Sequence, residues 1–176
     1  MRIAGIEDTS LVNGEGVRMT IFTSGCIHNC EGCHNPEMQE YFFGEEIENE
    51  TILQRIKDKL KWIDGLTLSG GDPLFQLSAT KELLQAIRND DELKDINIWL
   101  YTGYLFEDIP KSILKNVDVI IDGKYDKSLP EGKYRGSINQ KIMIKYPGTN
   151  KFTKRVYGDD ISAINRQRNI NNRLYE

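Results

Sequence analysis

The order of helix-like and strand-like segments is the feature that most restricts how this chain can fold. Three times, a segment with apolar residues at helical spacing is followed by a short apolar run that a glycine stops. Helices that alternate with buried strands indicate a parallel sheet with right-handed crossovers. The helix–strand units are expected at 51–62 with 66–69, at 78–88 with 96–101, and at 108–115 with 117–121.

Further strands are expected before and after these units, at 3–6, 17–24 and 138–146. Four or five strands are too few for a complete eight-stranded barrel, so the expected fold is α/β, an open or partial βα barrel with a mostly parallel sheet. Residues 1–157 are expected to form one domain. The polar segment 158–176 is interpreted as a C-terminal tail that could form a helix.

Composition excludes several classes of protein. The chain has no run of about 18 apolar residues and no apolar leader behind a basic start, so neither membrane insertion nor export is expected. Three cysteines cannot all pair within one chain, and a reducing cytoplasm is the expected compartment. Residues 1–123 carry a net charge of −11 and residues 124–176 one of +7. Because the positive charges are dispersed, a solvated surface or a protein-docking face is favoured over nucleic-acid binding.

Glycine-rich and cysteine-rich segments follow the expected strands. In open α/β sheets and βα barrels, ligands bind at the carboxyl ends of the strands. The sequence therefore places a binding site at one end of the sheet, formed by the segments 25–35, 70–73, 102–103 and 122–124.

The three cysteines, Cys26, Cys30 and Cys33, lie within eight residues and allow four interpretations. A loop rich in glycine, asparagine and histidine is a poor core segment, which disfavours three buried structural thiols. Zinc could be held by the thiolates with His28 or His34, although structural zinc sites usually combine two separate knuckles. The C-x-x-C-H run at 30–34 matches covalent haem attachment but leaves Cys26 without a role.

An iron–sulfur cluster is the fourth interpretation and the favoured one. Four-iron clusters normally take four cysteines, and the sequence has no fourth. One iron would then be free for a ligand that is not a protein side chain, and an open coordination position is typical of catalytic metal sites.

Six motifs in the expected order give the chain a resemblance to a known family. It resembles the radical S-adenosylmethionine superfamily and, within it, the glycyl-radical-enzyme activases that serve anaerobic ribonucleotide reductases. The superfamily often has an aromatic residue before the third cysteine, where this chain has Gly32, and a glycine there is similar to the reductase-activating branch. No segment after Tyr157 resembles the family. The motifs are NGEGVR at 13–18, SGCIHNCEGCHNP at 24–36, LSGGDPL at 68–74, YTGY at 101–104, IDGKY at 121–125 and RGSINQ at 135–140.

The resemblance implies that Cys26, Cys30 and Cys33 bind three irons of one 4Fe-4S cluster and that S-adenosyl-L-methionine binds the fourth. No side chain is assigned a catalytic role, because the radical is carried by the cofactor. Plain turns remain alternative explanations for the glycines and for the residues at 102, 122 and 124, as does simple surface exposure for the second histidine. The residues that the resemblance places at the cofactor are Gly32, Cys33, His34, Gly70, Gly71, Asp72, Thr102, Asp122 and Lys124.

The implied activity is that of a radical SAM oxidoreductase whose substrate is a protein. The resemblance implies reductive cleavage of S-adenosylmethionine and formation of a glycyl radical on an anaerobic (class III) ribonucleoside-triphosphate reductase. It also implies a flavodoxin or ferredoxin-type electron donor, and no nucleic-acid or membrane partner. Two alternatives remain open, an activase of another glycyl-radical enzyme and a small zinc-binding module without catalysis.

Overall fold

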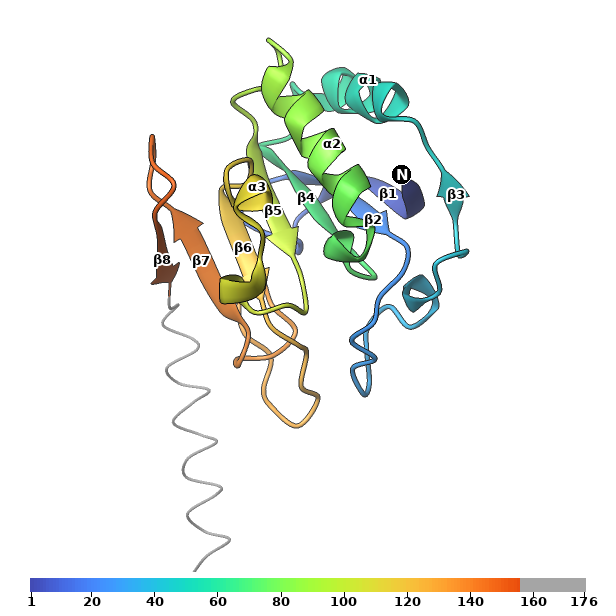
Figure 1. Cartoon of the computed structure of the whole chain (residues 1–176), viewed down its shortest axis with the longest axis vertical. Helices are drawn as coiled ribbons and strands as arrows, with labels where there is room; N and C mark the ends of the chain where they lie inside the picture. The colour runs from blue at the N-terminus through green and yellow to red at the C-terminus, as the bar shows by residue number, and fades with distance from the viewer. Residues whose placement is uncertain (156–176) are drawn as a thin grey trace, which may run out of the picture.

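The computed structural model describes residues 1–155 and shows a mixed, open sheet of eight strands in this part of the chain (Figure 1). Its centre is parallel, as the repeating helix–strand units predict. The central strands, in spatial order, are β2 (Arg18–Thr23), β4 (Gly65–Gly70), β5 (Asn97–Tyr101) and β6 (Val119–Asp122).

Antiparallel strands extend the sheet on both sides. Short connections link β1 to β2 and β7 to β8, and only antiparallel pairs can be joined without a crossover element. The sequence patterns predict neither β3, which has two residues, nor β8, which has two cationic side chains among four residues. The added strands are β1 (Arg2–Ser10) and β3 (Glu45–Glu46) beside β2, and β7 (Lys141–Lys145) and β8 (Phe152–Arg155) beside β6.

The α/β class and an open sheet with a parallel centre are therefore confirmed, and the sheet is mixed overall because four of the seven strand pairings within residues 1–155 are antiparallel. The radical SAM type of partial barrel stays a prediction. So do the domain limits, because the tail expected at 158–176 lies outside the described residues.

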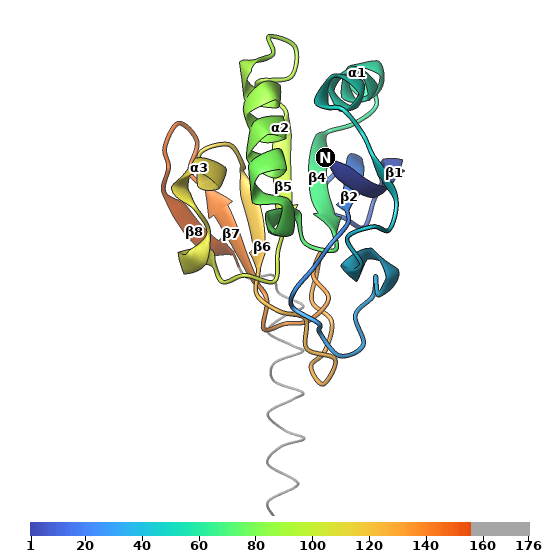
Figure 2. The same ribbon diagram turned by 45° about the vertical axis from the view of Figure 1, so that its right-hand side comes forward.

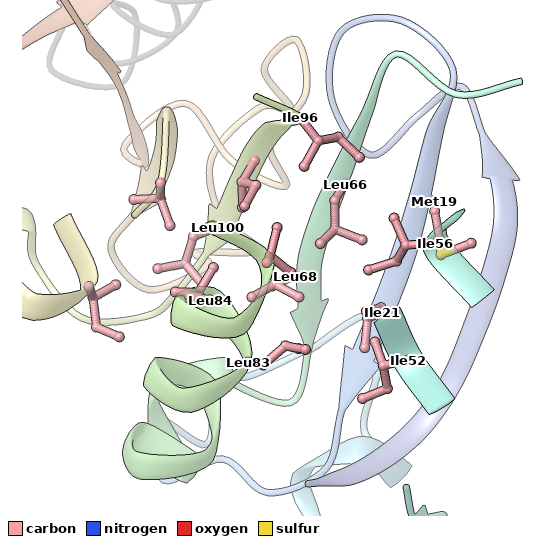
Figure 3. Close-up of a cluster of buried hydrophobic side chains, with 14 of the residues drawn as sticks. Met19, Ile21, Ile52, Ile56, Leu66, Leu68, Leu83, Leu84, Ile96 and Leu100 are labelled. Carbon is pink, nitrogen blue, oxygen red and sulfur yellow. The ribbon is translucent and has the colours of Figure 1, made fainter. Parts of the chain in front are cut away.

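Three helices cover one face of the sheet (Figure 2). Their apolar residues pack on every second residue of the strands, among them Ile21, Leu68 and Leu100, which are fully buried (Figure 3). Within the described residues, no helix has both the length and the apolar character needed to cross a membrane. The elements are α1 (Asn49–Lys59), α2 (Leu77–Asn89) and α3 (Lys111–Leu114), with 3₁₀ turns η1 (Glu37–Gln39), η2 (Pro73–Gln76) and η3 (Phe106–Asp108).

The other face of the central strands is buried too, with polar side chains on β2 and β4 and an apolar cluster of Trp99, Val119, Ile121 and Ile142 on β5 to β7. Arg18 is 1% exposed at the start of β2, and burial lowers the pKa of its guanidinium to about 10, so it remains charged at neutral pH. Its Nε atom donates to Thr67 Oγ1 at 2.7 Å, and its Nη2 atom donates to the carbonyls of Leu66 and Asn97 at 2.7 and 2.9 Å. Arg18 thus ties β2, β4 and β5 together at the end opposite the cysteine loop.

Candidate metal centre

The three cysteines lie in the loop after β2, at the end of the sheet where the parallel strands finish. Their thiols are free and half-buried, and all three line one cavity of about 550 Å³. Figures 1 and 2 show the cysteine loop and the segment after β6 at this same end. The geometry agrees with the rule that ligands bind beyond the carboxyl ends of parallel strands.

Backbone contacts hold the cysteine loop at its start. The N–H groups of Gly25 and Cys26 donate to the carbonyls of Met38 and Gln39 at 2.8 and 3.0 Å. Gly25 has a φ of 92°, and a Cβ at this residue would lie 2.3 Å from the ring of Phe75. Only glycine fits this turn, which brings Cys26 into the cavity.

Gly70 and Gly71 end β4 and line the same cavity. A Cβ on Gly70, which has a φ of 108°, would lie 2.4 Å from the backbone nitrogen of Thr23, and a Cβ on Gly71 would lie 2.5 Å from the carbonyl oxygen of Gly25. Close packing of the backbone therefore explains why both residues are glycine. Their position beside the cysteines leaves them available to a cofactor as well.

Asp72 is 1% exposed and is not among the residues that line the cavity. Its carboxylate accepts hydrogen bonds from the N–H groups of Leu74 and Gly103 at 2.8 and 2.9 Å, and from the hydroxyl of Thr102 at 2.9 Å. The Nε2 atom of His28 lies 2.7 Å from the same carboxylate. Asp72 thus joins β4, β5 and the cysteine loop, a role that the sequence pattern does not reveal.

Asp122 is fully buried and does not line the cavity. Two residues after Ile120 on the same strand, it faces the helices because strand side chains alternate between the two faces. Its carboxylate accepts from the N–H groups of Phe106 and Lys141 at 2.8 and 3.0 Å. These bonds hold the turn after β5 and the start of β7.

Two lysines after β6 contact the cysteine loop. The Nζ atom of Lys124 donates to the carbonyl of His28 at 3.4 Å. Gly32 has a φ of 72°, and a Cβ there would lie 3.2 Å from the side chain of Lys127, which is paired with Glu31. Neither Gly32, which belongs to the loop, nor Lys124, which contacts it, is among the residues that line the cavity.

His34 and Thr102 do line the cavity, as their positions in the motifs led us to expect. The ring of His34 lies 4.6 Å from that of Tyr125. The motif at 135–140 also contributes to the wall, where Arg135, 8% exposed, is hydrogen-bonded through Nη1 to the Gln140 carbonyl.

Tyr101 and Tyr134 line the cavity without having been predicted there. The Tyr101 hydroxyl donates to the carbonyl of Tyr134 at 2.7 Å. The alternation along β5 is the signal that could have identified Tyr101, because it lies on the face opposite the buried Ile98 and Leu100.

The thiols suit a thiophilic metal or cluster. Burial is the main cause that raises the pKa of Cys26, and the nearby Asp72 raises it further, so this thiol is protonated without metal. A metal binds the thiolate and displaces the proton. Three sulfurs line one cavity and the sequence has no other cysteine, so the donor set fits a 4Fe-4S cluster with one iron that has no protein thiolate.

Comparisons with known proteins agree with this donor set. The family of 4Fe-4S single cluster domains matches residues 12–143, a range that contains every residue discussed at the cavity. A protein of Enterobacteria phage T4 is 43% identical over 142 residues, which cover 78% of this chain and 90% of the relative. Relatives from Haemophilus influenzae and Escherichia coli K12 are 39% and 35% identical, cover 76% and 75% of this chain, and are themselves covered over 92% and 91% of their length. All three are named anaerobic ribonucleoside-triphosphate reductase-activating protein.

Proposed function

The chain belongs to the 4Fe-4S single cluster domain family and to the anaerobic ribonucleoside-triphosphate reductase-activating proteins, and from this membership we propose that it generates a glycyl radical on such a reductase. The observation that carries the proposal is the set of three cysteines on one cavity, in a sequence without a fourth. The reductase would be the protein substrate, and a flavodoxin or ferredoxin-type protein the electron donor.

Cys26, Cys30 and Cys33 would hold the cluster, with S-adenosyl-L-methionine on its fourth iron. When bound, the cluster and S-adenosyl-L-methionine would supply one-electron reductive cleavage of a carbon–sulfur bond, which would give methionine and a 5′-deoxyadenosyl radical able to take a hydrogen atom from a glycine Cα of the reductase. The chain's own residues would bind and orient the cofactor and exclude water from the cavity. No general base is needed, because no proton is transferred.

The wall of the cavity offers both exposed backbone and aromatic or polar side chains. Gly70 and Gly71 expose backbone beside the cysteines, which suits the amino and carboxylate groups of the methionine part. Tyr101, Tyr134 and Arg135 line the same cavity with ring faces and polar edges, which suit the nucleoside part. A volume of about 550 Å³ is within the usual range for small-molecule sites.

An exposed aromatic surface beside the cysteine loop supports a protein as the substrate. Tyr41 and Phe42 are 41% and 81% exposed, directly after the segment that hydrogen-bonds to the loop, and the Tyr41 ring lies 5.9 Å from that of Phe75. Exposed aromatic clusters are typical of protein interfaces. We call Tyr41, Phe42 and Phe75 the aromatic rim.

Anaerobic reconstitution tests the proposal. The protein loaded with iron and sulfide, given S-adenosylmethionine and dithionite, should form 5′-deoxyadenosine, and addition of the reductase should produce a glycyl radical in electron paramagnetic resonance. No product from a protein with a complete cluster would refute radical chemistry. Product without a radical on the reductase, but with one on another glycyl-radical enzyme, would change the assigned partner.

A zinc-binding module is the second candidate, because one observation favours it. Ligand atoms of Cys26, His28 and Asp72 lie within 4.8 Å of one another, a set that could hold zinc. Metal content decides between the two functions. If the protein purified without oxygen is colourless and contains one zinc and no iron, zinc binding replaces the proposed function.

A further inference from the structure

His28 lies between two of the cysteines and is the point where four segments of the chain meet. Its ring is buried, with 7% of the side chain exposed, whereas the preceding Ile27 is 63% exposed. The ring faces Asp72 through Nε2 at 2.7 Å and meets the ring of Tyr104 edge-on at 4.7 Å between centroids. The loop between the first and second cysteines is thus fixed by one side chain.

The partner of this ring is itself fixed. Asp72 already accepts hydrogen bonds from three donors in the turns after β4 and β5, so its carboxylate has one orientation. Gly103 lies directly under the imidazole, where a Cβ would be 2.3 Å from the His28 Cδ2 atom. Asp72 sets the direction of the ring, and the absence of a side chain at Gly103 lets the ring reach it.

The backbone of His28 links the ring to a predicted cluster ligand. Its N–H donates to the Sγ atom of Cys26 at 3.4 Å, and its carbonyl accepts from the Nζ atom of Lys124 at 3.4 Å. A hydrogen bond to a ligand sulfur stabilises the reduced state of an iron–sulfur cluster, because that state carries more negative charge. The backbone of His28 is thus hydrogen-bonded on both sides of its Cα while the ring is anchored on Asp72.

We propose that His28 is a positioning residue, which anchors the cysteine loop on Asp72 and so keeps its own N–H directed at the Cys26 sulfur, raising the reduction potential of the cluster. The inference rests on the proposed function, since it requires a cluster on the three cysteines. His28 as a metal ligand is the competing explanation, because the same atoms form the possible zinc set. Asp72 disfavours that explanation, since its three protein donors already occupy lone pairs that a metal would need.

Potentiometry of the reconstituted cluster tests the inference without S-adenosylmethionine or the reductase. His28→Ala should bind the same iron per protein as the unmodified chain but show a more negative midpoint potential. His28→Gln, whose amide can still donate to Asp72, should recover the original potential. Ile27→Ala is the matched control from the same loop and should leave the potential unchanged.

An unchanged potential in His28→Ala would overturn the inference. So would tight binding of one zinc by the unmodified protein that His28→Ala abolishes, because His28 would then be a ligand. If His28→Ala assembles no cluster, His28→Gln decides: an intact cluster with the original potential supports positioning, and failure to assemble overturns it. The proposed function fails separately, when an unmodified protein with a complete cluster forms no 5′-deoxyadenosine.

Discussion

A methyl group added at Gly103 should break the anchor of the cysteine loop. In Gly103→Ala the new Cβ would lie 2.3, 2.6 and 2.7 Å from the Cδ2, Cγ and Nε2 atoms of His28, whereas ordinary contacts begin at 3.4 Å. The imidazole would have to move by about 1 Å, which takes it out of hydrogen-bond distance of Asp72. Backbone strain is not expected, because Gly103 is absent from the positive-φ glycines of residues 1–155.

The magnitude follows from the bond that is lost. If the imidazole moves, the lost hydrogen bond to a charged group costs about 1.5–3 kcal/mol. If it stays, the overpacked contact costs about 1–3 kcal/mol. We expect the free energy of unfolding of the metal-free protein to fall by roughly 2 kcal/mol. Gly5→Ala is the matched control, since a Cβ there meets no atom within 4 Å.

Urea unfolding of a double-mutant cycle measures the effect. If the methyl group acts through the imidazole, Gly103→Ala should destabilise the original chain but have little effect in a His28→Ala background, where no ring is present to clash. The difference between the two backgrounds should be about 1.5 kcal/mol or more, well above the usual error of additivity. An equal loss in both backgrounds would refute the reasoning, because the cost would then lie elsewhere in the turn after β5.

The remaining predictions concern the cluster, the interior and the surface. Cys30→Ala should lose most of the iron bound after reconstitution, as measured by metal analysis, and full retention would contradict cluster binding by the three thiols. Arg18→Met should lower the free energy of unfolding by about 3–5 kcal/mol, because two backbone carbonyls lose their charged hydrogen-bond donor. The iron bound per folded protein should stay unchanged. Phe42→Ala should weaken binding of the reductase about tenfold in titration calorimetry, whereas Trp62→Ala, 72% exposed just after α1 and away from the cavity, should not. Equal effects of the two would remove the aromatic rim from the interface.

The local patterns of the sequence were sufficient for the central part of the fold and for the position of the three cysteines. Helical spacing and β-branched runs identify α1, α2 and the four parallel strands, because these patterns depend on residues a few positions apart. The three cysteines lie within eight residues, so their position after β2 follows once that strand is identified. The family resemblance rests on the same short motifs, and the comparisons confirm the part of it that concerns 4Fe-4S reductase-activating proteins.

Only the tertiary structure decided the contacts between motifs. Neither β3 nor β8 carries a distinctive pattern: β3 has two residues and forms by pairing with β1, which is distant in sequence, and β8 has two cationic side chains among four residues. Asp72 lies just after β4 and Asp122 is the last residue of β6, yet one anchors the cysteine loop and the other holds the helix side of the sheet. The sequence determined which residues gather at the carboxyl ends of the strands. The pleat of each strand and the packing of side chains across three strands decided which of these residues face the cavity. Residues far apart in the chain set that packing.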